Sequence, residues 1–456
     1  MSDNRYFYGT YENYNNPFTP KDPILNRDAR HLTRLSLLAG VGILCFVLVQ
    51  YVFSFLVLWL RSFTEPSFML DAILTILVTI IGIYVPFTVI QRFYTPEDRA
   101  LCVNLDAPVS KKAFIYALVT GTAAVFAGNY ITSGFSGFVS TYDIEFSAYE
   151  TESPATFLEF LLFIFEVAVI PALVEEVAIR GIVMPPLRKY GDRFAIIMSA
   201  IIFALMHSNM LQIPFAFVAG LVLAYFAIST NSLWTAVAIH AANNLLSAVS
   251  AVVIDRPVLS VIYMWMIFAL LVAGVICAKK FIKEPHYSLG LTFAPKSEKR
   301  FLFASGAVFL FISFVYSSYE GNSSAPYILT ALLFAFCLRR YFKANNLQRG
   351  ALPKSSLSLK TQVALYCATP TVVGGWVILI LSAMQSVTVT SSEGYFFLYG
   401  ALAAVLGAAI YMIYKILHSK SLESKSKAVY RKSLYVMIGV CIVMIITSFI
   451  SNLLMF

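Results

Sequence analysis

Thirteen long apolar segments follow one another along this 456-residue chain. Most have at least 18 residues, about the length that an α-helix needs to cross a bilayer. Two of them, at 194–209 and 212–228, are shorter and predict tilted, half-buried or shielded helices. The predicted spans are residues 36–60, 70–95, 113–131, 157–180, 194–209, 212–228, 233–254, 258–278, 301–318, 325–342, 362–385, 396–418 and 434–456. This pattern predicts an all-α polytopic membrane protein with about 13 transmembrane helices.

The composition supports the same fold class. Hydrophobic residues make up 59% of the chain and charged residues only 12%, whereas a soluble domain carries about 25% charged residues. The net charge is +9, but the basic residues cluster in short loops between apolar runs. We therefore expect a lipid bilayer and no nucleic acid as partner. The six cysteines are scattered, which argues against a disulfide framework or a thiolate metal cluster.

The distribution of charge in the loops predicts the orientation. With the N-terminus in the cytoplasm, the predicted inside loops hold groups of Lys and Arg, such as Lys279, Lys280 and Lys283. The largest predicted outside loop, 132–156, has four acidic residues and no Lys or Arg. This asymmetry is typical of cytoplasmic and external loops. We expect a multi-pass integral protein of the plasma membrane with a cytoplasmic N-terminus.

Four regions are predicted along the chain. Residues 1–33 are polar and rich in Asn, Tyr and Pro, and predict a mostly disordered cytoplasmic tail. Residues 34–112 hold two N-terminal transmembrane helices, and residues 113–284 form a core region. Residues 285–456 hold five apolar spans without an acidic residue or histidine in their middles, so their pattern does not indicate a role.

Polar side chains interrupt three successive apolar segments of the core region. Glu175-Glu176-x-x-x-Arg180 ends one segment, Phe203-x-x-x-His207 ends another, and His240-x-x-x-Asn244 lies in the middle of a third. Polar and ionisable groups are costly in lipid, and those that occur there usually face a protein interior and have a function. The three motifs therefore predict a functional site inside the membrane.

Helical spacing predicts which residues of the first two motifs pair or pack with each other. Glu176 and Arg180 are four residues apart on one helical face, so they can form an ion pair that lowers the cost of burying either charge. An ordinary ion pair at the helix end would explain these two residues equally well. Glu175 points about 100° away and is left for another partner. Phe203 shares a face with His207 and is expected to pack beside it and to shield the imidazole from lipid.

The third motif holds two neighbouring asparagines. His240 and Asn244 are four residues apart and share a face, whereas Asn243 points about 100° away. We therefore predict that Asn244 belongs to the site and that Asn243 makes an interhelical hydrogen bond.

Two mechanisms fit these residue types, and both hydrolyse an amide. In the first, Glu175, His207 and His240 hold a zinc ion or position its water, because zinc favours imidazole nitrogen and carboxylate oxygen. In the second, Glu175, helped by His207, removes a proton from water, and His240 and Asn244 donate hydrogen bonds to the oxyanion. The residues alone do not decide between them.

Two further features bear on the geometry. Pro171 precedes the glutamates and is expected to kink their helix and free a carbonyl near the site. The predicted spans place His207 about 20 Å from the cytoplasmic side and Glu175 only about 8 Å from it, at 1.5 Å per residue. A tilted or late-starting helix is needed to bring the two side chains together.

The three motifs, in this order on three membrane helices, resemble the CPBP family. This family groups type II CAAX prenyl proteases with bacteriocin-processing and immunity proteins. The resemblance covers residues 113–255 and implies an intramembrane endopeptidase with a possible zinc cofactor, acting on a membrane-associated peptide or protein near the cytoplasmic face. It implies that Glu175 activates water with His207, that His240 and Asn244 complete the site, and that Glu176 and Arg180 form a supporting pair. The chain departs from the family at Ile179, where an aromatic residue is common.

Two other classes of function are weighed against this one. A non-catalytic membrane scaffold or bacteriocin-immunity partner could use the same fold without cutting a bond, although the intact Glu, His, His and Asn set argues against it. A transporter is disfavoured because the chain shows no repeated halves with matching broken helices.

Overall fold

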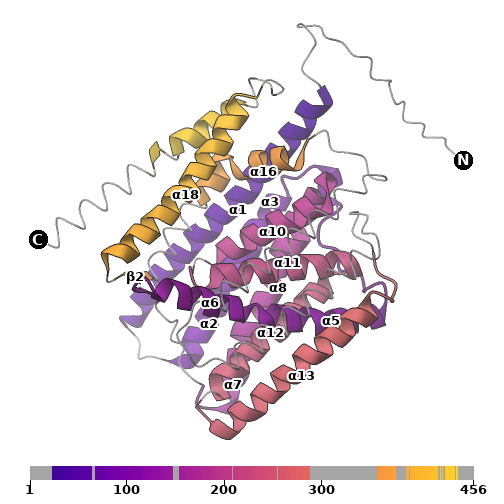
Figure 1. The fold of residues 1–456 in the computed structure, drawn as a ribbon, viewed down its shortest axis with the longest axis vertical. Coiled ribbons are helices and arrows are strands. Elements are labelled where there is room, and N and C mark those ends of the chain that lie inside the picture. Colours follow the sequence, from indigo (N-terminus) through magenta and orange to yellow (C-terminus); the bar gives the residue numbers. More distant parts are fainter. Residues whose placement is uncertain are drawn as a thin grey trace, which may run out of the picture.

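The computed structural model describes residues 23–63, 67–146, 154–207, 209–253, 255–287, 357–375, 387–389 and 391–419, with 422, 424, 427–436 and 438–439. The described part is a bundle of helices with one two-stranded sheet (Figure 1). Its elements are α1 (Pro23–Arg61), α2 (Phe68–Thr79), η1 (Ile80–Tyr84), α3 (Val85–Gln91), α4 (Pro96–Arg99), α5 (Lys111–Ala127), α6 (Asn129–Ser140), β1 (Ile144–Phe146), α7 (Phe157–Ile164), η2 (Phe165–Val169), α8 (Ile170–Glu176), η3 (Val177–Val183), α9 (Met184–Leu187), η4 (Arg188–Tyr190), α10 (Asp192–Met206), α11 (Gln212–Thr230), α12 (Leu233–Val253), α13 (Pro257–Phe281), α16 (Leu359–Cys367), β2 (Val387–Val389) and α18 (Ser392–Leu417).

Within these residues, seven helical segments are long and apolar enough to cross a membrane. They are Asn26–Arg61, Phe68–Gln91, Lys111–Ser140, Phe157–Tyr190, Gln212–Thr230, Leu233–Val253 and Pro257–Phe281. The all-α membrane fold is thereby confirmed. The count of 13 stays a prediction, because the predicted spans 301–318 and 325–342 lie outside the described residues and those at 362–385 and 434–456 are described only in part.

The first helix corrects the predicted N-terminal tail. Residues 23–33, which the sequence assigned to a disordered tail, form the first turns of α1. Ala29 and Leu32 are fully buried, and Thr33 forms a hydrogen bond with Tyr430 at 2.7 Å. Long-range partners hold this polar segment in a helix, and a local sequence pattern does not reveal such partners.

Local signals set several helix ends. Thr156 and Glu159 form a capping box at the start of α7, which satisfies two backbone N–H groups that a helix start leaves free. Gly191 adopts a φ of 113° in the turn between η4 and α10, a conformation that favours glycine. Asn231 ends α11 in the left-handed region with a φ of 52°.

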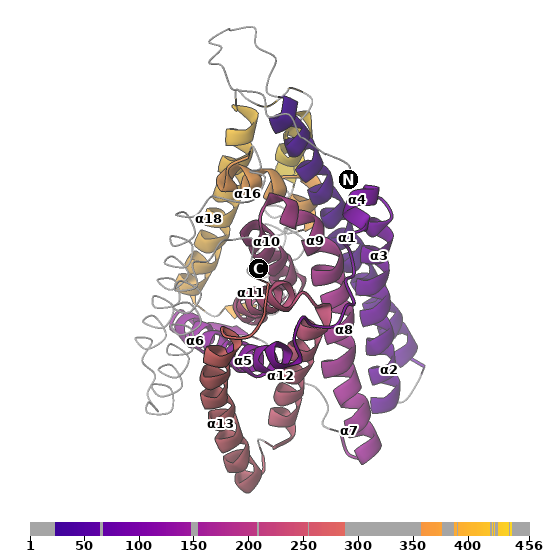
Figure 2. The ribbon, with the colours of Figure 1, turned by 90° about the vertical axis from the view of Figure 1, so that its right-hand side faces the viewer.

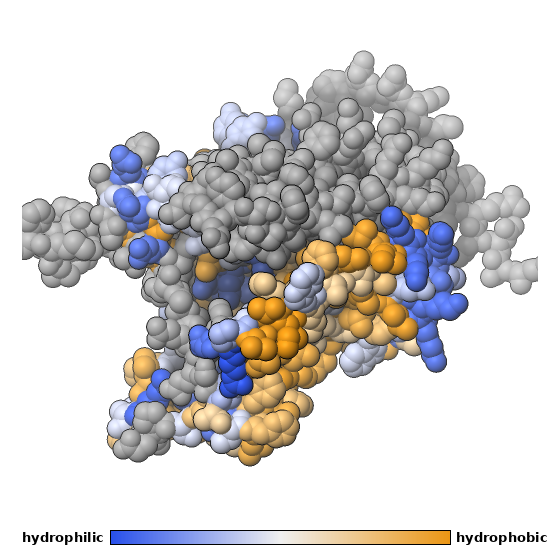
Figure 3. Space-filling model, turned by 60° about the horizontal axis from the view of Figure 1, so that its bottom comes forward, coloured by the Kyte–Doolittle hydropathy of each residue, from blue (hydrophilic) through white to orange (hydrophobic). Residues whose placement is uncertain are grey.

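Helices α10 and α11 lie in the centre of the bundle in both ribbon views (Figures 1 and 2). They pack closely because Gly220 of α11 faces Ala200 of α10, where an added Cβ would come within 2.9 Å of the Ala200 Cα. Small residues allow such close approach between membrane helices. Large apolar side chains are exposed on outer helices, including Phe55, Phe157 and Trp265. Figure 3 shows apolar surface over much of the described face that it presents.

The described C-terminal segments pack against the earlier helices at two places. Near α16, Ser36 of α1 donates a hydrogen bond to the Tyr366 carbonyl, and the Cys367 Sγ lies 3.7 Å from the Met198 sulfur of α10. At the other place, β2 pairs antiparallel with β1, and Tyr142 stacks on Phe397 of α18. The described C-terminal segments therefore contact α1 and α10 at one place and the β1 region at the other.

Candidate active site

A single long helical segment, Phe157–Tyr190, carries both glutamates near its middle. They end α8, which lies between the π-helical turns η2 and η3. Pro171 lacks an N–H, so the Val167 carbonyl four residues earlier loses its helical donor. The Asn244 side chain takes that place and donates to the Val167 carbonyl at 3.1 Å. The carbonyl that Pro171 was expected to free is therefore present and bound by α12.

The length of this segment removes the expected mismatch in depth. The helix does not end near residue 180 but continues to Tyr190, and Gly191 then turns the chain into α10. Glu175 lies 15 residues before Tyr190, and His207 lies 15 residues after Asp192. At 1.5 Å per residue, both are about 22 Å from the turn. The helix runs past the predicted boundary at residue 180, so Glu175 and His207 lie at similar distances along their helices from this turn.

Glu176 is the structural glutamate of the pair. Its side chain is fully buried, and its Oε1 accepts a hydrogen bond from Arg180 Nη1 at 2.8 Å. The same oxygen lies 3.0 Å from His240 Nδ1. Because this carboxylate is already paired with an arginine, it is the acceptor and His240 Nδ1 is the donor. The predicted ion pair is confirmed, and it lies deep in the helix rather than at a helix end.

Arg180 has partners on two further helices. Its Nη2 donates to the Gly220 carbonyl at 3.1 Å, and its guanidinium lies 4.3 Å from the centre of the Phe203 ring. A desolvated cation over an aromatic face is attracted by the ring quadrupole. The Gly220 carbonyl could not be identified from the sequence, because a backbone acceptor leaves no signal in a motif.

Glu175 has a different environment from its neighbour. Its side chain is 16% exposed, and its Oε2 lies 4.0 Å from His240 Nε2. Among the described residues this oxygen is buried and has no hydrogen-bond partner. His240 is therefore held by Glu176 on one side of its ring and faces Glu175 with the other.

Phe203 joins the two histidines. Its ring meets His207 edge-on at 4.9 Å between centroids and His240 at 5.6 Å. His207 follows the last residue of α10, and its Nδ1 lies 2.8 Å from the Phe203 carbonyl. Since a carbonyl can only accept, Nδ1 is the donor and Nε2 is left available. Phe203 packs against His207, as its spacing predicted.

The asparagines reverse one prediction. Among the described residues, Asn244 and not Asn243 makes the interhelical hydrogen bond, through its contact with Val167. Asn243 is buried and donates from Nδ2 to Asn244 Oδ1 at 3.3 Å. Helical angles separate the two side chains by about 100° but do not say which one meets the helix opposite.

The donors predicted for zinc fit only in part. Both histidines bind an acceptor through Nδ1 and leave Nε2 available, as metal-bound histidines commonly do. In the part of the chain that the structure describes, however, no three His, Cys, Asp or Glu side chains gather closely enough to hold one ion. Zinc on Glu175, His207 and His240 therefore stays a prediction, and no step below runs through it.

Comparison with known proteins gives one finding. Residues 157–246 match a family model described as type II CAAX prenyl endopeptidase Rce1-like. This range contains all three polar motifs and both asparagines. A search of curated proteins and a search of solved structures each gave no match.

Proposed function

We propose that this protein, which belongs through residues 157–246 to the Rce1-like group of CPBP membrane proteases, is an intramembrane endopeptidase. The contrast between the two glutamates carries the proposal. Glu176 is paired with Arg180, whereas Glu175 Oε2 has no hydrogen-bond partner among the described residues and lies beside a histidine nitrogen. A carboxylate kept free in a buried site is suited to remove a proton from water.

In the proposed reaction, Glu175 with His207 takes a proton from water, and the water oxygen attacks the carbonyl carbon of the scissile amide. Asn244 stabilises the resulting oxyanion by donating a hydrogen bond, and His240 does so from Nε2 in its imidazolium form, because its Nδ1–H is donated to Glu176. The Asn244 amide has a second N–H beyond the one given to Val167. The carbon–nitrogen bond then breaks, and Glu175 returns its proton to the leaving nitrogen.

We place the substrate among membrane-associated peptides or proteins, cut near the cytoplasmic face. The basic residues around the turn that joins Tyr190 to α10, Arg188 and Lys189, favour a cytoplasmic location for this end of the bundle. The same rule favours a cytoplasmic N-terminus. The family description names CAAX prenyl endopeptidases, and prenylated C-terminal peptides and bacteriocin-type leader peptides are the two substrate classes to compare first.

The test compares membrane-bound and released peptides from cells that carry wild type, Glu175→Gln or Glu97→Gln. Glu97 is exposed on α4, so its isosteric change is the matched control. A peptide produced by wild type and Glu97→Gln but not by Glu175→Gln supports the protease and identifies its substrate. Identical profiles from all three, with the Glu175 variant still supporting the cellular role, would favour a scaffold or immunity partner.

A further inference from the structure

Two adjacent prolines leave a gap in the hydrogen bonding of the glutamate-bearing helix. The Gly181 carbonyl would normally accept from the residue four or five positions later, but those positions are Pro185 and Pro186, which have no N–H. The Val103 N–H fills the gap and donates to the Gly181 carbonyl at 2.7 Å. Val103 reaches it with a φ of 53°, which is uncommon for a β-branched residue.

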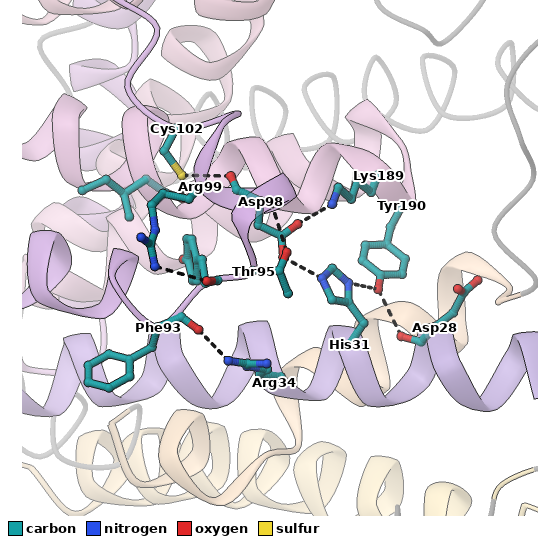
Figure 4. Close-up of polar contacts among 12 residues, drawn as sticks. Asp28, His31, Arg34, Phe93, Thr95, Asp98, Arg99, Cys102, Lys189 and Tyr190 are labelled. Atoms are coloured by element: carbon teal, nitrogen blue, oxygen red, sulfur yellow. Dashed lines mark hydrogen bonds and ion pairs between the residues drawn. The ribbon is translucent and has the colours of Figure 1, made fainter.

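The neighbouring carbonyl has a similar partner. Ile182 lies four residues before Pro186, and its carbonyl is 3.8 Å from the Cys102 Sγ, whose shorter hydrogen bond goes to the Asp98 carbonyl at 3.4 Å (Figure 4). Burial raises the pKa of this thiol to about 12, with a smaller contribution from the Asp98 charge, so it stays a neutral donor. Residues 102–109, which we call the strap, therefore attach to η3 immediately after Arg180.

The other part of the strap is attached to the turn between α11 and α12. Its contacts there come from both side chains and backbone. They are Asn104 Nδ2 to the Asn231 carbonyl at 3.2 Å, Trp234 Nε1 to the Leu105 carbonyl at 3.1 Å, Ser232 Oγ to the Asp106 carbonyl at 2.7 Å and Val109 N to the Thr230 carbonyl at 3.2 Å. This turn leads into α12, which carries His240 two helical turns after Leu233.

A buried carboxylate fixes the chain just before the strap. Asp98 of α4 accepts hydrogen bonds from His31 of α1 at 2.7 Å, from Lys189 of η4 at 2.5 Å and from Thr95 at 2.9 Å (Figure 4). Its side chain is 1% exposed. Asp98 therefore holds the chain just before the strap against both α1 and the end of the glutamate-bearing segment.

From these contacts we infer that the strap is a positioning segment of the proposed active site, with Val103 as its positioning residue. It ties the helix of Glu175, Glu176 and Arg180 to the start of the helix of His240. Its function is to hold the distance between Glu176 Oε1 and His240 Nδ1 at 3.0 Å. The catalytic part of this inference rests on the proposed protease function, whereas the attachment to the proline-freed carbonyl does not.

Pro185→Ala separates positioning from simple stabilisation. The new N–H at position 185 can donate to the Gly181 carbonyl within the helix and so displace Val103. If the strap only stabilises the fold, Pro185→Ala should change activity little, because the helix itself gains a hydrogen bond. A positioning strap predicts a fall in kcat of about tenfold or more, with KM within about twofold, since small displacements of reacting groups lower the rate strongly. Val103→Gly keeps the N–H and accommodates the positive φ, so it should keep the protection of residues 102–109 against exchange.

The experiment uses the full chain in lipid nanodiscs and two measurements on each variant. Hydrogen–deuterium exchange of the peptide that contains residues 102–109 reports attachment of the strap, and peptide cleavage reports kcat and KM. We expect Pro185→Ala to lose protection and kcat together. Lost protection with full kcat would overturn the positioning role, and unchanged protection would overturn the attachment to Gly181.

A second variant covers the case in which Pro185→Ala does not fold. Ser232→Ala removes the hydroxyl that donates to the Asp106 carbonyl at the other end of the strap, and Ser133→Ala, exposed on α6, is its matched control. We expect Ser232→Ala to lower both the protection of residues 102–109 and kcat. If wild type has no activity that depends on Glu175, the proposed protease fails, but the exchange measurement still decides whether the strap is attached as described.

Discussion

Replacing Glu175 by glutamine should remove activity while leaving the protein at least as stable as wild type. The Glu175 Oε2 atom is buried and has no hydrogen-bond partner among the described residues. Glutamine keeps a polar group at this position but removes the charge, whose burial is costly, and the side chain is still 16% exposed, so we expect a gain of no more than about 1 kcal/mol in the free energy of unfolding. Loss of a general base should lower kcat by at least about a hundredfold.

The neighbouring substitution should have the opposite effect on stability. Glu176→Gln removes the charge that compensates Arg180, and both side chains are fully buried. Breaking a buried ion pair by removing one partner costs about 3–5 kcal/mol. The Gly220 carbonyl and the Phe203 ring still contact the guanidinium, so we expect a loss near the lower end of this range.

The assay is equilibrium unfolding of both variants and wild type in the same detergent at neutral pH, together with peptide cleavage. The two substitutions are isosteric and adjacent, so each is the control for the other. Equal destabilisation by both, or a destabilised Glu175→Gln with an unaffected Glu176→Gln, would refute the assignment of one catalytic and one structural glutamate.

Three further predictions follow from the described contacts. Burial alone would raise the pKa of Asp98, but hydrogen bonds from its three partners outweigh burial and lower that pKa below its ordinary value of 3.8. Asp98→Asn should therefore lower the free energy of unfolding by about 2 kcal/mol at pH 7. The difference between the variant and wild type should shrink as the pH of an unfolding series falls below 3.8. Phe203→Leu removes the ring over Arg180 and should lower both kcat and the free energy of unfolding, the latter by about 2 kcal/mol, as kinetics and unfolding will measure. Asn244→Ala should lower kcat by about a hundredfold or more if its amide binds the oxyanion, whereas Asn243→Ala should change kcat less; equal losses of kcat would contradict the choice of Asn244.

Much of the site follows from helical spacing alone. The four-residue spacing of Glu176 and Arg180 predicted their ion pair, and the same spacing predicted that Phe203 packs beside His207. The position of Pro171 predicted a freed carbonyl. These contacts lie within one helix or depend on the missing N–H of one residue, so the sequence contains all the information that they require.

The contacts that the sequence did not predict join distant segments. His31 was assigned to a tail because its neighbours are polar, yet its ring bonds to Asp98 and Tyr190. The interhelical hydrogen bond was assigned to Asn243 but is made by Asn244, since helical periodicity fixes the angle between two side chains but not the helix that each one faces. The end of the glutamate-bearing span was placed at residue 180 because charged side chains interrupt the apolar run there, whereas residues 181–187 are again apolar and the helix continues to Tyr190.

The prolines of the glutamate-bearing segment connect these two kinds of contact. Pro171 and the Pro185-Pro186 pair each remove a helical hydrogen bond, and each freed carbonyl is bound by a group from elsewhere in the chain. One partner belongs to α12 itself, and the other belongs to the strap that holds the start of α12. Glu175 and Glu176 therefore lie between two points at which their helix is bound, directly or through the strap, to the helix of His240. A helix without these prolines would have a more complete internal ladder but no means of fixing that alignment, so the loss of helix stability at these positions is consistent with a role in positioning the site.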